Sequence, residues 1–270
     1  MQKRGAVTVF IILALLIVFS FSAYFIARSN VGADKKADFD TAYADSLRNY
    51  IDSCLKDTTS DGLVYAGMNG GYVYFPLDLQ RININSNLKL SVLYNQGKKS
   101  LLPLPEIERQ LALYVEEKLQ FCIDFSSFEE QRYAVEDGEV EANITIGDES
   151  VLAKIVYPVN ISKGEKIVKM DEFTITVPLR FGKIYKTVNQ TLSDLAYSDS
   201  KPAWELEEKV WPYLAGEPGY SLNFILNSYD MNVSYDFFDE QVSIWSVSDD
   251  FDGDIYRFSF AAVHPLKREV

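Results

Sequence analysis

An uninterrupted apolar run near the N-terminus constrains this chain more than any other feature. Ala6 to Ala27 spans 22 residues without a charged residue, Asn, Gln, His, Pro or Gly. A helix of that length reaches about 33 Å, enough to cross a bilayer hydrocarbon core of roughly 30 Å. The run therefore predicts one membrane-spanning helix, which makes residues 1–28 an anchor and the lipid bilayer a partner.

The length of this run also bears on whether the helix is retained. A removable signal peptide usually has an apolar region of about 7 to 15 residues, followed by a cleavage site of small residues. This run is longer, and no Ala-x-Ala site follows it. We expect a retained single-pass anchor, with removal at its C-terminal end as the alternative.

Charge restricts the partners of the remaining chain. Only Lys3 and Arg4 are charged before Arg28, so the chain from Arg28 on carries 24 basic and 39 acidic side chains, a formal charge of −15. Such a surface repels phosphate backbones, and nucleic acid is not an expected partner. Basic residues flank the run on both sides, so charge does not fix its orientation.

Cysteines and sequons favour an extracytoplasmic location. Both cysteines follow the run, as do four Asn-x-Ser/Thr sequons, which are glycosylation candidates in exported proteins. The sequons begin at Asn143, Asn160, Asn189 and Asn232. We therefore expect a cell-membrane protein with the bulk of its chain outside the cytoplasm.

A short motif opens the apolar run. Arg4-Gly5-Ala6 is followed by Thr8, which resembles the class III signal of archaeal type IV pilin-like proteins. The resemblance implies processing between Gly5 and Ala6, and other pilin-like subunits or envelope proteins as partners. Members that polymerise usually carry Glu at the fifth mature position, where this chain has Phe10, which argues against ordinary filament assembly. A plain membrane anchor is the alternative.

Two amphipathic helices are predicted beyond the run, from Phe39 to Thr58 and from Ile107 to Cys122. Their apolar residues recur at steps of three and four, which is the spacing of one helix face. They form a predicted helical stalk region over residues 29–132. Between them, residues 72–76 and 88–94 read as short extended segments that pair as a hairpin.

Cys54 and Cys122 are the only cysteines, and each lies on the apolar stripe of its helix. In an oxidising exterior each is the other's only partner within the chain, which predicts a disulfide. By closing a loop of 68 residues, this bond would stabilise the fold by about 4 kcal/mol. Two buried free thiols are the alternative, because free cysteine also packs on apolar helix faces.

From residue 133 the hydrophobic period changes to two, which predicts an antiparallel β-rich ectodomain over 133–270. Strands are expected at 140–146, 151–161 and 166–177 as a meander, and later at 232–237, 241–247 and 255–263. Additional helices are expected at 179–197 and 205–214, and a helix is favoured over a strand at 220–229. The fold class is therefore α+β: an N-terminal transmembrane helix, two disulfide-linked helices, then an antiparallel sheet with additional helices.

Few residues in the sequence suggest catalysis or the binding of a cofactor or metal. The sequence has no phosphate-binding loop, dinucleotide fingerprint, Cys-x-x-Cys or metalloprotease helix, so neither a cofactor nor an enzyme is expected. The single histidine, His264, lacks partners that the sequence could place beside it for zinc binding or nucleophilic catalysis. Asp250, Asp252 and Asp254 are weak Ca²⁺ candidates, but a solvated turn between two strands is favoured there.

Glutamate pairs and aromatic clusters in the sequence have simpler explanations than a catalytic or sugar-binding site. The pairs Glu116-Glu117, Glu129-Glu130 and Glu207-Glu208 could serve a glycosidase, yet exposed helix faces explain them. Two aromatic groups could stack on sugars, although core packing is favoured. They are Tyr72, Tyr74 and Phe75, and Trp204, Trp211 and Tyr213.

These observations favour a membrane-anchored, pilin-like extracytoplasmic protein with a structural, surface or adhesion role. The alternatives are an ectoenzyme that hydrolyses envelope polymers and an accessory subunit of a membrane complex. The absence of a recognisable catalytic set favours the first.

Overall fold

The computed structural model describes residues 39–84, 89–200, 221–226, 231–237, 241–251 and 253–265. By their contacts the residues fall into two units, Met1–Leu47 and Arg48–Val270, and helix α2 (Phe39–Met68) begins in the first. Within the described ranges, no helix is both long and apolar enough to cross a membrane. The predicted span Ala6–Ala27, its processing site and the predicted helix 205–214 lie outside these ranges.

The first sheet is the predicted meander. It consists of β5 (Glu141–Ile146), β6 (Val151–Lys163) and β7 (Lys166–Val177), all antiparallel, with β4 (Ala134–Asp137) pairing further along β6. Every second residue of β6 from Val151 to Ile161 is buried. This alternation gives the sheet one packed face and one exposed face, as the sequence period of two requires.

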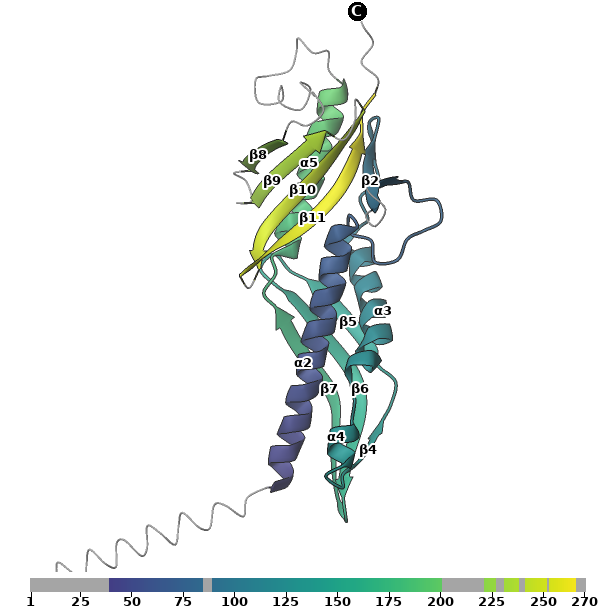
Figure 1. Cartoon of the computed structure of the whole chain (residues 1–270), viewed down its shortest axis with the longest axis vertical. Coiled ribbons are helices and arrows are strands. Elements are labelled where there is room, and N and C mark those ends of the chain that lie inside the picture. The colour runs from purple at the N-terminus through teal and green to yellow at the C-terminus, as the bar shows by residue number, and fades with distance from the viewer. Residues whose placement is uncertain are drawn as a thin grey trace, which may run out of the picture. The chain divides into compact units, whose positions relative to one another are not determined.

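Two helices pack beside each other on this sheet (Figure 1). They are α3 (Leu104–Cys122) and the part of α2 from Arg48 on, and the short α4 (Ser126–Glu129) follows α3. Gly62 on α2 lets the helices approach closely, because a Cβ there would lie 2.9 Å from the Tyr114 ring. The predicted helix over 107–122 is confirmed, and its predicted stripe is buried from Ile107 to Leu119, whereas Cys122 at its end is exposed.

The second sheet has seven strands in the order β1-β2-β11-β10-β9-β8, with β3 beside β2. Its strands are β1 (Arg81–Asn83), β2 (Lys89–Asn95), β3 (Lys98–Lys99), β8 (Ser221–Leu226), β9 (Met231–Phe237), β10 (Val242–Phe251) and β11 (Asp254–Val263). The pairing of β2 with β11 is parallel. The expectation of a purely antiparallel sheet is therefore wrong, because strands from distant parts of the chain meet around Leu90, Val92 and Ala261.

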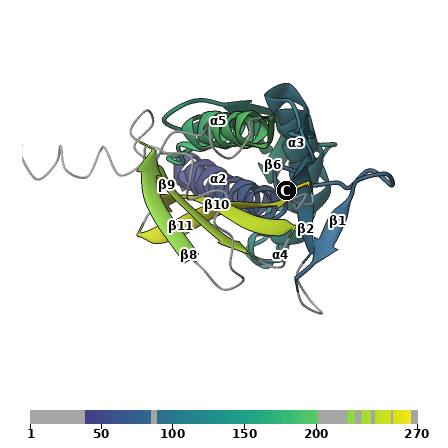
Figure 2. The same ribbon diagram turned by 90° about the horizontal axis from the view of Figure 1, so that it is seen from above.

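Helix α5 (Phe181–Ser200) and the C-terminal end of α2 lie on one face of this second sheet (Figure 2). Phe181 contacts Tyr256 and Phe258, and the Tyr256 hydroxyl donates a hydrogen bond to Leu63 O at 2.8 Å. The predicted stripe of α5, which is Ile184, Val188, Leu192 and Leu195, is buried. The sheet thus has an apolar core between its strands and two helices.

Two expected elements differ from the structure. Residues 72–76 form no strand, because Val73 N and Tyr74 N donate to Gln110 Oε1 at 2.9 and 3.0 Å instead of to a neighbouring strand. The predicted hairpin is therefore wrong. The segment 221–226 is strand β8, not a helix, since it pairs along its whole length with β9.

Candidate functional site

The single histidine lies at the end of β11, next to a buried serine. His264 N donates to Gln241 O at 2.7 Å, which continues the pairing of β10 with β11 by one more residue. His264 Nε2 lies 2.8 Å from Ser243 Oγ, and Ser243 is fully buried on β10. The backbone register of these two strands brings the pair together.

A carboxylate completes a line of three groups. His264 Nδ1 lies 3.6 Å from Asp199 Oδ1, close to the C-terminal end of α5. The Tyr94 hydroxyl of β2 donates to Asp199 Oδ2 at 2.5 Å. Burial, together with this hydrogen bond to Asp199, raises the pKa of Tyr94. Three strands of the second sheet, β2, β10 and β11, and helix α5 therefore meet at one polar network.

The direction of the hydrogen bond between Trp245 and Ser243 follows from donor chemistry. The Trp245 indole N–H can only donate, and it lies 2.7 Å from Ser243 Oγ, which must accept. In the tautomer that leaves Nε2 without a proton, Ser243 donates its own proton to His264 Nε2. In that tautomer the imidazole holds its own proton at Nδ1, facing Asp199.

Serine, histidine and aspartate in this order are the side chains of nucleophilic acyl transfer. The surroundings differ from such a site in two respects. Ser243 has no exposed surface, and Trp245 already donates to its Oγ. Strand β10 is paired on both sides at Ser243, so the backbone amides there serve the sheet. In this conformation a substrate carbonyl has no access to the hydroxyl, and the network instead joins β2, α5, β10 and β11.

The sequence could not place partners beside His264, and the structure brings Ser243 and Asp199 to it. Ser243 precedes it by 21 residues and Asp199 by 65 residues, and no motif links the three. The expected turn between the strands 241–247 and 255–263 was the one available signal, because such a turn brings the start of the first strand near the end of the second. Nothing in the sequence indicated Asp199, which reaches the histidine through the packing of α5.

The acidic stretch from Asp249 to Asp254 joins β10 to β11, as the predicted turn requires. Asp249 points inward, and Arg180 donates two hydrogen bonds to it, one of them from Nε to Oδ2 at 3.0 Å. Asp250 is exposed, whereas Asp252 and the side chain of Asp254 lie outside the described residues. Among the described residues, no group of three or more His, Cys, Asp or Glu could hold a metal ion.

The glutamates of α3 hold backbone groups. Glu116 Oε1 accepts a hydrogen bond from Ala142 N at 2.9 Å, and Glu108 Oε1 accepts one from Ile146 N at 2.8 Å. Glu117 accepts a hydrogen bond from the Tyr74 hydroxyl at 2.8 Å. Glu116 and Glu117 are therefore engaged separately, one by β5 and the other by a tyrosine, and Glu207-Glu208 lies outside the described residues.

The first aromatic cluster is packed, as favoured from the sequence. Tyr72 is buried and its hydroxyl donates to Ser100 O at 3.2 Å. The Arg81 guanidinium lies over the Phe75 ring at 4.3 Å from its centroid, so a cation–π contact covers that ring face. The second cluster, Trp204, Trp211 and Tyr213, lies outside the described residues.

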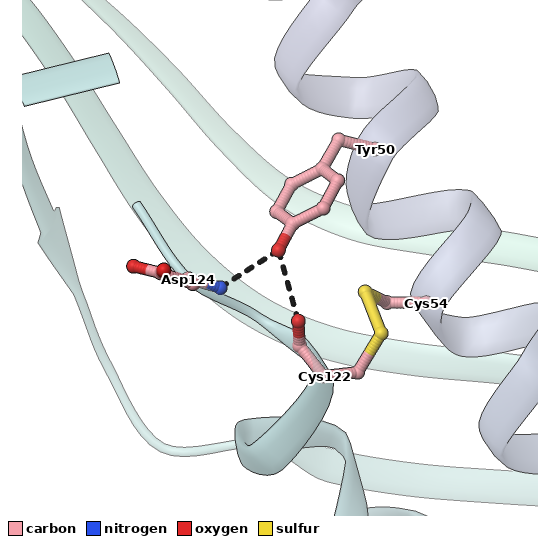
Figure 3. The surroundings of a disulfide bond; sticks show 4 residues. All are labelled: Tyr50, Cys54, Cys122 and Asp124. Atoms are coloured by element: carbon pink, nitrogen blue, oxygen red, sulfur yellow. Dashed lines mark hydrogen bonds between the residues drawn. A yellow bond between two sulfur atoms is a disulfide. The ribbon is translucent and has the colours of Figure 1, made fainter. Parts of the chain in front are cut away.

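The predicted disulfide is confirmed (Figure 3). Cys54 and Cys122 are bonded between α2 and α3, with a Cα–Cα distance of 5.7 Å. The Tyr50 hydroxyl lies beside this bond, where it donates to Cys122 O at 2.9 Å and accepts from Asp124 N at 2.8 Å. These contacts fix the end of α3 against α2.

The four predicted sequons differ in exposure. Asn143 on β5, Asn189 on α5 and Asn232 on β9 are exposed, whereas Asn160 on β6 is half-buried.

Comparison of the chain with models of protein families, with curated proteins and with solved structures gave no match.

Proposed function

We propose that this chain is a membrane-anchored, pilin-like extracytoplasmic protein that acts by binding or as a structural part of the envelope. The observation that carries the proposal is the Cys54–Cys122 disulfide, because disulfides persist in oxidising compartments outside the cytoplasm. The apolar run Ala6–Ala27 and the Arg4-Gly5-Ala6 motif support an anchor with pilin-type processing.

The closed polar network favours a role without catalysis. Ser243 is fully buried and bonded on both sides, by Trp245 and by His264. A nucleophile needs an open approach for its substrate and donors aimed at the developing oxyanion. Within the described residues, this Ser–His–Asp set connects strands and a helix, which suits a structural role better than a catalytic one.

The mature N-terminus and the compartment test this proposal together. Membrane and soluble fractions from cells that produce the full chain are separated, and the N-terminal peptide is identified by mass spectrometry. A membrane-bound chain that begins at Ala6 and has its cysteines oxidised is expected. Gly5→Val should block the processing, whereas Val9→Leu should leave it unchanged.

Other outcomes decide against parts of the proposal. An intact N-terminus at Met1 on a membrane-bound chain would reduce it to a plain anchor. A soluble chain with two alkylatable thiols would overturn it.

A second candidate is an ectoenzyme that hydrolyses envelope polymers, with Ser243 as nucleophile and His264 as base. The order of Ser243, His264 and Asp199 favours it. A fluorophosphonate probe, which reacts with activated serines, separates the candidates. Labelling that is lost in Ser243→Ala but kept in Ser246→Ala, on the same strand, would establish the hydrolase; the leading proposal expects no labelling of Ser243.

A further inference from the structure

The exposed face of the first sheet carries apolar side chains that the core does not use. Leu152 and Val156 on β6 are 41% and 39% exposed, and both point away from the buried residues of that strand. Between them Lys154 forms an ion pair with Glu172 of β7 at 2.9 Å. The face is therefore polar at its centre, with an apolar side chain on each side.

A sequon lies beside these residues on the same face. Asn143 pairs with Lys154 across β5 and β6, and Thr145 pairs with Leu152. The side chains of Asn143 and Thr145 are both exposed, since every second residue of β5 points outward. The described part of the chain offers the Asn143 amide no side-chain hydrogen bond, so it is available for modification.

The other three sequons are less accessible. An enzyme that modifies a sequon must reach both the asparagine amide and the hydroxyl two residues later. Thr191, which follows Asn189, is fully buried and donates to Thr187 O at 2.9 Å within α5. Asn160 and Asn232 lie on strands paired on both sides, and their serines, Ser162 and Ser234, are half-buried.

Strand β5 lies at the edge of its sheet, yet its outer backbone edge is already occupied. Glu116 and Glu108 accept the amides of Ala142 and Ile146. A further strand would have to displace these carboxylates. The outward face of β5 therefore remains as the available surface of this strand.

We propose that Asn143 carries an N-linked oligosaccharide, which lies across the outward face of β5 and β6 and covers Leu152 and Val156. The inference rests on the extracytoplasmic location proposed above, because N-glycosylation acts on exported chains. The apolar faces of the sugar rings and their acetamide methyl groups suit exposed aliphatic side chains, while Lys154 and Glu172 suit their hydroxyls.

Glycopeptide mass spectrometry tests the attachment. The full chain is produced in a host that N-glycosylates exported proteins, and each sequon peptide is quantified with and without its glycan. We expect occupancy at Asn143 to exceed that at Asn160 several-fold. Asn143→Gln and Thr145→Val should abolish it, Thr145→Ser should keep it, and Asn232→Gln is the matched control.

The state of the cysteines in the same sample separates the two proposals. Unmodified Asn143 in a chain with an intact Cys54–Cys122 bond would overturn the proposal of a glycan and would leave the proposed extracytoplasmic location standing. Unmodified Asn143 with free thiols overturns both.

Enzymatic removal of the glycan tests its position on the sheet. Binding of a fluorescent dye that reports exposed apolar surface should rise several-fold after removal, and Leu152→Thr with Val156→Thr should suppress that rise. Unchanged dye binding after removal would show that the glycan does not cover this face.

Discussion

Asp249 stands in the most acidic stretch of the chain, yet its carboxylate faces the interior. Its side chain is 3% exposed and is paired with Arg180, which lies immediately before α5. Burying a charge is tolerated when a hydrogen-bonded partner of opposite sign accompanies it. The arginine therefore allows an acidic residue to occupy an inward position near the end of β10.

Arg180→Ala is expected to lower the free energy of unfolding by about 3 kcal/mol, because it leaves the buried Asp249 carboxylate unpaired. Urea unfolding followed by circular dichroism measures the change. Lys154→Ala is the control, since the Lys154–Glu172 pair is 45% and 60% exposed and should contribute less than about 1 kcal/mol. Equal losses in the two variants would contradict the distinction.

The buried hydroxyl of Tyr256 should make the stability of the fold depend on pH in the alkaline range. Burial raises the pKa of its hydroxyl well above the ordinary value of 10.0. Below about pH 10 both folded and unfolded states keep the proton, so its stabilising contribution is complete. Above that pH the unfolded chain loses its proton first, and the free energy of unfolding falls as pH rises.

Urea midpoints measured between pH 8 and about pH 11 should therefore decline, and the decline should be shallower in Tyr256→Phe. Tyr65→Phe, whose residue is 44% exposed, is the matched control and should keep the slope of the parent chain. Identical slopes in Tyr256→Phe and in the parent would refute the assignment to Tyr256.

At the scale of elements, helix α3 covers the backbone edge of the first sheet at β5. Two of its glutamates accept amides of β5 that would otherwise be unpaired. Unpaired strand edges promote association with other chains, and covering them is a recognised protection. The helix thus both fills the core through its apolar face and closes the backbone edge through its carboxylates.

Glu108→Ala combined with Glu116→Ala should lower the free energy of unfolding by about 2 kcal/mol, roughly 1 kcal/mol for each lost hydrogen bond. It should also increase association, measured by light scattering at rising concentration. The matched pair Glu108→Gln and Glu116→Gln keeps an acceptor oxygen at each position and should show little association. If the alanine and glutamine variants behaved alike, edge protection by these acceptors would be excluded.

Local pattern decided which elements could be predicted. The alternation in 141–177 and the spacing of three and four in α3 and α5 are properties of neighbouring residues, and those elements matched. Residues 72–76 have strand-forming side chains, but Gln110 supplies their hydrogen bonds. Strand β8 reads as a helix until β9 is beside it, because its pattern suits both.

At the scale of the whole molecule, the disulfide is the covalent cross-link within the described residues. It ties α2 to α3 across a sequence separation of 68 residues. This predicted bond was accessible from sequence because only two cysteines exist. The Ser243–His264–Asp199 network could not be predicted from the sequence, since its members meet only after β10, β11 and α5 have packed. The parallel pairing of β2 with β11 could not be predicted either.

Reduction of the Cys54–Cys122 bond should lower the free energy of unfolding by about 4 kcal/mol. Urea unfolding with and without a thiol reductant measures this effect. Cys54→Ser combined with Cys122→Ser should be as unstable as the reduced parent and should not respond to the reductant. A parent chain whose midpoint is unaffected by reduction would contradict the expected contribution.

The disulfide also determines how the protein responds to mechanical tension. A pulling force applied between the N-terminal side of α2 and the C-terminal end of the chain passes at Cys54 through the sulfur bridge to Cys122. The segment between the two cysteines, which are 68 positions apart in sequence and could span up to about 230 Å when extended, therefore bears no load and cannot be drawn out while the bond is intact. With the N-terminus held by the proposed membrane anchor, this bridge would limit how far the described part can be stretched.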